Sequence, residues 1–252
     1  MTVVRKFVFS LAVLSVMSYS ESANTAQHPI QRIIGGTEAE PGSAPYMVAL
    51  MASRFRGGGI IINKYYVLTT AACVPDDNFY VLAGVFDISS GEYDQRLPVD
   101  RVTRHIKDDI ALIRLGVPIF FDDLVKSAVL PPRGSIHSGD VVVFGWGSSS
   151  RSYSTLNKAV LDIVNYDRCQ LIFGGAGASP LNERNMCTGP LSGGIAPCTG
   201  DAGSPIVQTN ANGEDEVVGL VSWGFIPCGG EGNPQVHIRL SAYIDWIVEN
   251  LR

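Results

Sequence analysis

The amino-acid sequence predicts an all-β fold. Short runs rich in β-branched and aromatic residues recur along the chain, and turn signals of glycine, proline and asparagine separate them. Only the C-terminal end shows helical spacing. Such short, regularly spaced strands are typical of a β-sandwich or a β-barrel. At 252 residues the chain can form one large β domain or two small ones.

Each expected strand is a short apolar run between turn signals. The clearest strands are 46–50, 60–62, 65–69, 79–83, 110–115, 141–146, 159–164 and 217–223. The turns between them include 41–42, 57–59, 131–134, 138–140 and 212–213. A proline-rich stretch within residues 120–136 is expected to link two similar halves.

The C-terminal segment predicts a helix over about 241–252. Tyr243, Ile244, Ile247, Val248 and Leu251 recur at helical spacing, which places their side chains on one face. Ser241 precedes this run and is the expected N-cap.

The N-terminal segment, residues 1–20, resembles a secretory signal peptide. Arg5 and Lys6 form a short basic region, residues 7–17 are almost entirely apolar, and the small residues of 18–20 suit cleavage. The apolar run is far shorter than the roughly 20 residues of a transmembrane helix, and no later segment reaches that length. We therefore expect a soluble, secreted, extracellular protein without a membrane partner.

The charge argues against polyanionic partners. The full chain carries 19 basic and 24 acidic residues, and without residues 1–32, which hold three basic residues and one acidic residue, the net charge becomes −7. This surplus disfavours nucleic acid and anionic lipid as partners. The spacing of cysteines and histidines matches no metal site, so we expect neither a metal nor a cofactor.

Four motifs occur in the order that the trypsin and chymotrypsin family of serine proteases shows. They are residues 32–36 (RIIGG), 67–73 (VLTTAAC), 108–112 (DDIAL) and 200–205 (GDAGSP). The chain from about Ile33 to Arg252 resembles this family throughout. The resemblance implies two antiparallel six-stranded β-barrels, at about 33–130 and 131–240, followed by the C-terminal helix.

The resemblance also implies a zymogen. Residues 21–32 would be an activation pro-segment, and cleavage after Arg32 would free the amino group of Ile33. In the family this ammonium group pairs with the aspartate before the nucleophile, which here is Asp201.

Two of the three catalytic positions hold alanine. Ala72 stands at the position of the histidine, Ala202 at that of the serine, and Asp109 is the surviving triad member. An alanine methyl group can neither attack a carbonyl nor accept a proton. We expect Asp109 to be satisfied by Ser222 and nearby backbone amides. The backbone N–H groups of Gly200 and Ala202 would still form the oxyanion hole.

No other residue is expected to restore catalysis. His105 should lie on an exposed loop, and Ser204 lies two residues after the nucleophile position. In this fold neither residue is placed for the hydrogen bond that a general base and its nucleophile must share.

The resemblance predicts a changed specificity pocket. Ala196 occupies the floor where trypsin-like members carry aspartate, and Gly224 belongs to one wall. Gln235 replaces a usual glycine and His237 a usual tyrosine, so that a side chain should enter the pocket. Such a pocket has either been remodelled for another ligand or filled after cleavage ceased to matter. We favour filling, since a binding site needs several convergent polar groups.

The five cysteines leave one without an internal partner. The resemblance implies two bridges in the second barrel, Cys169 with Cys187 and Cys198 with Cys228. The cysteine that would pair with Cys73 is replaced by Arg56.

The first functional hypothesis is a secreted, proteolytically inactive homologue that acts by binding proteins. The combination of changes is similar to the inactivated serine protease paralogues of parasitic mites, which implies interference with host defence such as complement. One alternative is a serine endopeptidase whose alanines were engineered. Another is a decoy for protease inhibitors. The sequence predicts neither the oligomeric state nor the identity of the partner.

Overall fold

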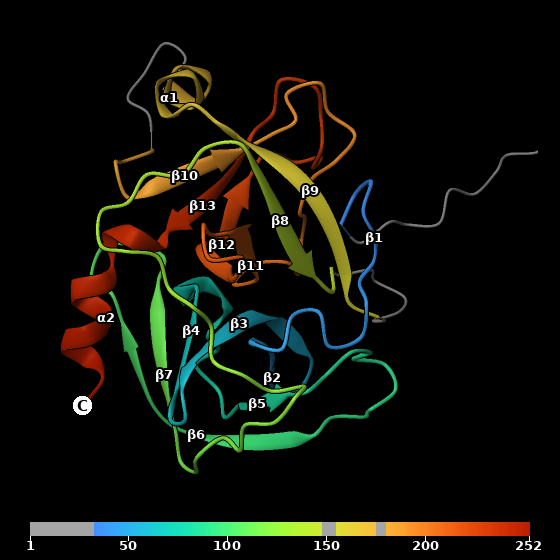
Figure 1. Ribbon diagram of the computed structural model, residues 1–252, viewed down its shortest axis with the longest axis vertical. Coiled ribbons are helices and arrows are strands. Elements are labelled where there is room, and N and C mark those ends of the chain that lie inside the picture. The colour runs from blue at the N-terminus through green and yellow to red at the C-terminus, as the bar shows by residue number, and fades with distance from the viewer. Residues whose placement is uncertain (1–32, 148–154, 175–179) are drawn as a thin grey trace, which may run out of the picture.

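The computed structural model describes residues 33–147, 155–174 and 180–252, which form two adjacent β-barrels (Figure 1). The expected signal peptide, the pro-segment and Arg32 lie outside the described residues. This architecture confirms the predicted fold class. None of the helices in the described part of the chain has the length and apolar character needed to cross a bilayer.

The first barrel closes in the strand order β2-β3-β4-β7-β6-β5. All six pairings are antiparallel. Its core is aliphatic and includes Val48, Leu50, Ile61 and Ile113, all fully buried. The strands are β2 (Met47–Met51), β3 (Phe55–Asn63), β4 (Tyr66–Thr69), β5 (Tyr80–Ala83), β6 (Gln95–Arg104) and β7 (Ala111–Leu115).

The second barrel runs β9-β10-β13-β12-β11-β8 and closes where β8 pairs with β9. The short strand β1 (Thr37–Glu38) pairs with β9, although it precedes the whole first barrel in the chain. The other strands are β8 (Asp140–Gly145), β9 (Asn157–Val164), β10 (Asn185–Thr188), β11 (Pro205–Thr209), β12 (Asp215–Gly224) and β13 (Gln235–Arg239).

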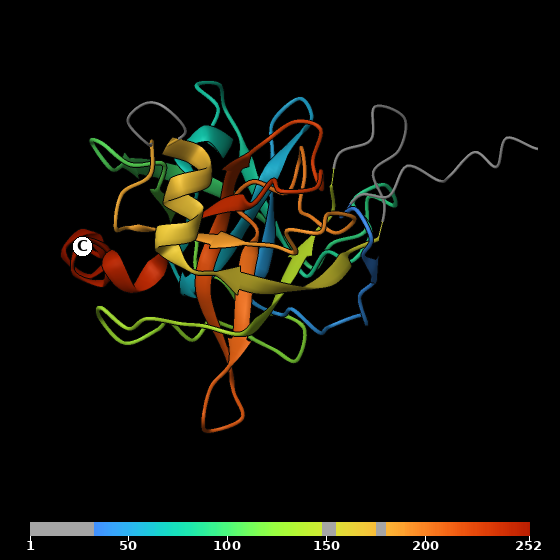
Figure 2. The same cartoon turned by 90° about the horizontal axis from the view of Figure 1, so that it is seen from above.

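Two helices complete the described structure (Figure 2). Helix α1 (Tyr166–Gly174) follows β9 on the outside of the second barrel, and α2 (Ile244–Asn250) ends the chain. Residues of this C-terminal segment return to the first barrel, where the rings of Tyr243 and Trp246 meet the ring of His105. Short 3₁₀ turns lie at Ala71–Cys73 and Leu240–Ala242.

The predicted cap of the C-terminal helix is wrong. The N-cap residue is Tyr243, with no side-chain cap, and Ser241 lies in the preceding 3₁₀ turn. The Ser241 hydroxyl donates instead to the Ser135 carbonyl at 2.7 Å. A serine hydroxyl can satisfy a distant backbone group as well as a helix end.

The two barrels meet at the loop that contains Ala202. The Gly58 N–H of β3 donates to the Ala202 carbonyl at 2.9 Å, and the Gly203 N–H donates to the Val221 carbonyl of β12 at 2.8 Å. Gly203 has φ +79°, and a Cβ there would overlap the Gly58 carbonyl. Glycine is therefore needed at 203 both for its backbone conformation and for the close approach of β3.

Candidate active site

Asp109 is held in place by hydrogen bonds from Ala72 and Ser222. It lies just before β7 and is half-buried. Its Oδ1 accepts a hydrogen bond from the Ala72 N–H at 2.8 Å, and its Oδ2 accepts one from the Ser222 hydroxyl at 2.6 Å. The expectation that Ser222 and a backbone amide satisfy this carboxylate is confirmed. Asp109 is thus fixed in place by groups that do not depend on a histidine.

Ala72 lies in the 3₁₀ turn Ala71–Cys73, and its side chain is exposed. The turn brings the Ala72 backbone to Asp109, as the hydrogen bond between them shows. At the position where a general base would stand, the protein presents only a methyl group, which cannot accept a proton.

Ala202 and Gly200 retain the backbone part of an oxyanion hole. Gly200 has φ +94°, a conformation that favours glycine. Within the described residues, neither the Gly200 N–H nor the Ala202 N–H donates to any group. Unpaired backbone N–H groups of this kind can bind a carbonyl oxygen or an anion. The site can therefore bind such an oxygen but offers no Oγ to attack the carbon.

Cys73 does not replace the missing nucleophile. Its side chain is buried and unpaired, and the Thr70 hydroxyl lies 3.1 Å from its sulfur. Burial raises the pKa of the Cys73 thiol to about 11, and the Thr70 hydrogen bond offsets only part of this shift. Because the thiolate is the reactive form, a buried thiol with a raised pKa is inert.

His105 and Ser204 do not supply the missing groups either. His105 is not on an exposed loop, as the sequence led us to expect. Its ring packs edge-on against Tyr243 and Trp246, with centroids 5.6 and 5.5 Å away, and its Nδ1 accepts the Asp108 N–H at 3.1 Å. Aromatic contacts from the distant C-terminal segment account for this burial. Ser204 is fully buried in the interface between the barrels.

Asp201 is completely buried next to the nucleophile position. Its Oδ1 accepts the Gly147 N–H at 2.8 Å, and its Oδ2 accepts the Cys198 N–H at 2.9 Å. Burial raises the pKa of the Asp201 carboxyl to about 7, although the two N–H groups act in the opposite direction. The part of the chain that the structure describes provides Asp201 with no cationic partner.

The segment that begins at Ile33 is docked against the same region. Ile33 is buried in the core of the second barrel. Ile34 and Ala196 exchange backbone hydrogen bonds of 2.9 and 3.1 Å, which joins this segment to the pocket floor. The structure therefore buries both members of the predicted activation pair, Ile33 and Asp201.

Gln235 places a buried side chain at the predicted specificity pocket. Its side chain lies against Gly224, where an added Cβ would overlap Gln235 Oε1. Gln235 is only 5% exposed, and its Nε2 has no hydrogen-bond partner. This occlusion agrees with the expectation that residue 235 places a side chain in the pocket.

The four residues assigned to this pocket carry no charge at pH 7. His237 is fully buried, and its Nε2 lies 2.7 Å from the Thr188 hydroxyl. Burial lowers the pKa of His237 to about 3, so the ring is neutral at pH 7. With Ala196 at the floor, no acidic group is present there to bind a basic side chain. The contribution of Thr188 was not predicted, since a single threonine in a short strand carries no sequence signal.

The cysteine pairing matches the prediction. Disulfides join Cys169 to Cys187, with Cα atoms 6.4 Å apart, and Cys198 to Cys228, with Cα atoms 5.7 Å apart. Cys73 is unpaired. The described residues contain no group of three or more His, Cys, Asp and Glu side chains that could hold a metal ion.

An aromatic cluster beside the pocket was not predicted. Phe173 of α1 stacks on Phe225 at a centroid distance of 4.6 Å and meets Trp223 edge-on at 5.0 Å. Trp223 is 38% exposed. The cluster joins a helix to a strand end about 50 positions later, so no local pattern could have indicated it.

Comparisons with known proteins agree with this geometry. A family model described as Trypsin matches residues 33–247. The chain is 30% identical to Trypsin-1 of Astacus astacus, over 86% of this chain and 99% of the relative. It is 31% identical to Lectizyme of Glossina austeni, over 97% and 96%. It is also 32% identical to the clotting factor G beta subunit of Tachypleus tridentatus, over 87% and 80%. The chain therefore belongs to the trypsin family of serine proteases.

Proposed function

We propose that this chain is a proteolytically inactive member of its family that acts by binding other proteins. The observation that carries the proposal is the pair of alanines at 72 and 202 beside a satisfied Asp109. The remaining aspartate has lost the imidazole that it would orient and the hydroxyl that this imidazole would activate.

The expected loss of turnover without the serine and the histidine is large enough to support inactivity. In a serine protease of another fold, removing the serine or the histidine alone lowers turnover by about 10⁶, which is roughly 8 kcal/mol of barrier. Losing both costs little more, because the groups act as a unit. The oxyanion hole and substrate binding alone leave an acceleration of about 10³–10⁴ over water. That is too slow for useful cleavage of peptide bonds.

The cleft still offers features that bind without cutting. The N–H groups of Gly200 and Ala202, unpaired within the described residues, can donate hydrogen bonds to a carbonyl oxygen, and the aromatic cluster around Trp223 presents a partly exposed apolar surface. Exposed aromatic side chains are enriched at protein interfaces. Because Gln235 occupies the specificity pocket, the partner would not need to insert a particular side chain there.

We propose that the protein acts outside the cell and that its partners belong to host defence, with complement proteins as the first candidates. Two disulfides support an oxidising compartment. The expected signal peptide over residues 1–20 agrees with export.

A decoy for protease inhibitors is the second candidate function, favoured by the free N–H pair at 200 and 202. Gln235 argues against it, because many inhibitors insert a side chain where this glutamine lies. A third possibility is an ordinary endopeptidase with engineered alanines, but the missing partner of Cys73 and the glutamine at 235 would have no place in a simple knockout.

Two measurements test the proposal together. The purified chain, cleaved after Arg32, is incubated with a peptide library and with a serine-directed covalent inhibitor. We expect no turnover and no adduct. The same protein is used to capture partners from plasma, with an active trypsin-family protease blocked at its serine as the matched control. Turnover that the inhibitor abolishes would refute the proposal, as would capture of nothing beyond what the control retains.

A further inference from the structure

A cavity of about 480 Å³ lies on the second barrel, outside the cleft. It is partly open to solvent and is lined by segment 136–138, the end of β9, the start of α1, strand β10 and Arg239 of β13. None of its lining residues belongs to the triad positions, the oxyanion hole or the specificity pocket. Its volume falls within the roughly 300–1,000 Å³ that is usual for small-molecule sites.

The walls of this cavity are mainly apolar. Ile163, Val164, Met186 and the Cys187 half of a disulfide line it, and Ile136 stands at the rim with 77% of its surface exposed. Water finds few hydrogen-bond partners at such walls, whereas a hydrocarbon chain would bury apolar surface of both the ligand and the cavity. The cavity therefore favours a ligand with an apolar body.

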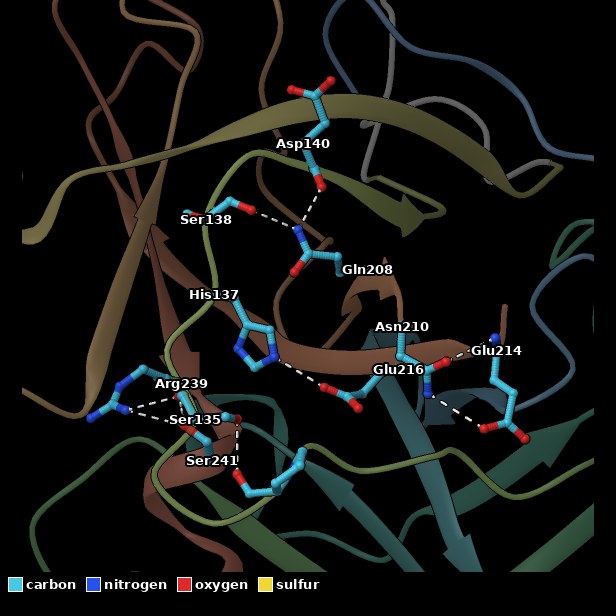
Figure 3. Close-up of polar contacts among 11 residues, drawn as sticks. Ser135, His137, Ser138, Asp140, Gln208, Asn210, Glu214, Glu216, Arg239 and Ser241 are labelled. Atoms are coloured by element: carbon cyan, nitrogen blue, oxygen red, sulfur yellow. Dashed lines mark hydrogen bonds and ion pairs between the residues drawn. The ribbon is translucent and has the colours of Figure 1, made fainter. Parts of the chain in front are cut away.

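Arg239 gives the cavity a positive charge. Its guanidinium donates only to neutral oxygens. They are the Ser135 carbonyl and the Ser241 hydroxyl (Figure 3) and the Glu183 carbonyl. These contacts use four of its five N–H donors and leave one on Nη2. No ion pair of Arg239 with an acidic side chain occurs among the described residues. The charge is held in place but not neutralised.

Other donors beside the cavity are also unused. Asn185 Oδ1 accepts the Asn182 N–H at 3.0 Å, whereas within the described chain Asn185 Nδ2 and the Tyr166 hydroxyl have no partner. His137 is already engaged, since its Nε2 lies 3.0 Å from Glu216 Oε1 and its ring is turned toward that carboxylate (Figure 3). Apart from the exposed Glu183 carboxylate, the free hydrogen-bonding groups near Arg239 are therefore mainly donors.

We propose that this cavity binds a small amphipathic carboxylate of the fatty-acid type. The hydrocarbon chain would lie between Ile163 and Met186, and the carboxylate would reach Arg239 and Asn185. A carboxylate leaves water at low cost only where a cation and hydrogen-bond donors receive it. The Glu183 carboxylate is exposed at the rim, where water weakens its repulsion of the ligand.

Isothermal titration of the full chain with decanoate, 1-decanol and decylamine tests the proposal. The three probes share one chain and differ in the head group. A charge-assisted hydrogen bond contributes about 1.5–3 kcal/mol, so we expect decanoate to bind at least about tenfold tighter than decanol. Decylamine should bind more weakly than either.

Three variants locate the site. Ile163→Trp should fill the cavity and weaken decanoate binding at least about tenfold, whereas Val248→Trp, on the exposed face of α2, is the matched control and should change nothing. Arg239→Gln should abolish the preference for decanoate over decanol. Because Arg239 also joins three chain segments, its replacement could disturb the fold. Asn185→Leu is therefore the second test: the Asn185 Nδ2 group bonds to no other part of the described chain, and its loss should reduce the preference for decanoate several-fold.

The possible outcomes separate clearly. A preference for decanoate that Ile163→Trp abolishes and Asn185→Leu reduces supports the site. Equal binding of acid and alcohol, tighter binding of the amine, or no binding of any probe overturns it. A decanoate site unaffected by Ile163→Trp also overturns it, because the ligand would then bind elsewhere.

Discussion

Two aspartates, Asp201 and Asp109, have kept different surroundings. Asp201 is fully buried and accepts only backbone N–H groups, from Gly147 and Cys198. Asp109 is half-buried and accepts one backbone N–H and one side-chain hydroxyl, from Ala72 and Ser222. Alanine keeps the backbone of the residue that it replaces, so that the framework around both aspartates persists. On the proposed function, what has been lost is only the chemistry that the side chains at 72 and 202 would provide.

The sharpest test restores that chemistry. The double variant Ala72→His with Ala202→Ser should gain peptide-bond hydrolysis by as much as about 10⁶-fold, because Asp109 and the free N–H groups are already placed. The assay measures kcat/KM after cleavage following Arg32. The substrates need glycine or alanine at the cleaved bond, since Gln235 occupies the pocket.

Each single variant is the control for this experiment. Ala72→His and Ala202→Ser alone should gain little, because base and nucleophile act as a unit. A folded double variant with no gain would show that the framework has changed more than its hydrogen bonds indicate.

The second prediction concerns the cost of burying Asp201. Its folded pKa is about 7, raised from 3.8. A raised folded pKa means that the stabilisation is complete below the unfolded pKa and is lost as the pH rises through the folded value. For the chain not cleaved after Arg32, the free energy of unfolding should therefore fall by roughly 3 kcal/mol between pH 4 and pH 7.

Urea unfolding at several pH values measures this loss. Asp201→Asn keeps the shape and removes the titration, so its slope over that range should be flatter than that of the parent. Cleavage after Arg32 should also flatten the slope, because an ammonium group at Ile33 would favour the ionised carboxylate. An unchanged slope in Asp201→Asn would assign the pH dependence to other groups.

The third prediction restores a covalent link near Asp109. Cys73 is unpaired, and its sulfur lies against Gly57, where an added Cβ would overlap it. Gly57→Cys should therefore form a disulfide with Cys73 and raise the free energy of unfolding by about 3 kcal/mol, the value for a loop of this length.

Titration of free thiols, together with unfolding in the presence and absence of a reductant, checks the third prediction. The gain should disappear on reduction. Gly57→Ser is the matched control, since it adds a side chain of similar size without a thiol. Two free thiols in the folded Gly57→Cys variant would contradict the expected pairing.

The sequence predicted the strands with apolar runs, including those that form β2, β4, β7, β8 and β12, because burial leaves a local pattern. It did not predict β6, whose residues are mostly polar and largely exposed. It also missed α1, which buries only Cys169, and β13, where the polar Gln235 and His237 take buried positions. These elements are set by tertiary contacts, which a short window of sequence does not contain.

The candidate site was predictable to the extent that it follows ordered motifs. The position of Asp109, the two bridges and the intrusion of Gln235 all depended on residues within those motifs. The burial of His105 between Tyr243 and Trp246 did not, since its partners lie about 140 positions away in the chain. Contacts of this range become visible only in three dimensions.

The smallest expected effect concerns the hydrogen bonds of Asp109. Asp109→Ala removes the acceptor of both the Ala72 N–H and the Ser222 hydroxyl. Hydrogen bonds to a charged group contribute about 1.5–3 kcal/mol each when buried, and partial exposure lowers this, so a loss of about 1–2 kcal/mol is expected. Ser222→Ala, which removes one of the two, should cost less. A double-mutant cycle between these changes, followed by chemical unfolding, isolates the Asp109–Ser222 contact. A coupling near zero would mean that the Asp109–Ser222 contact adds no stability, and that only the Ala72 N–H holds Asp109 in place.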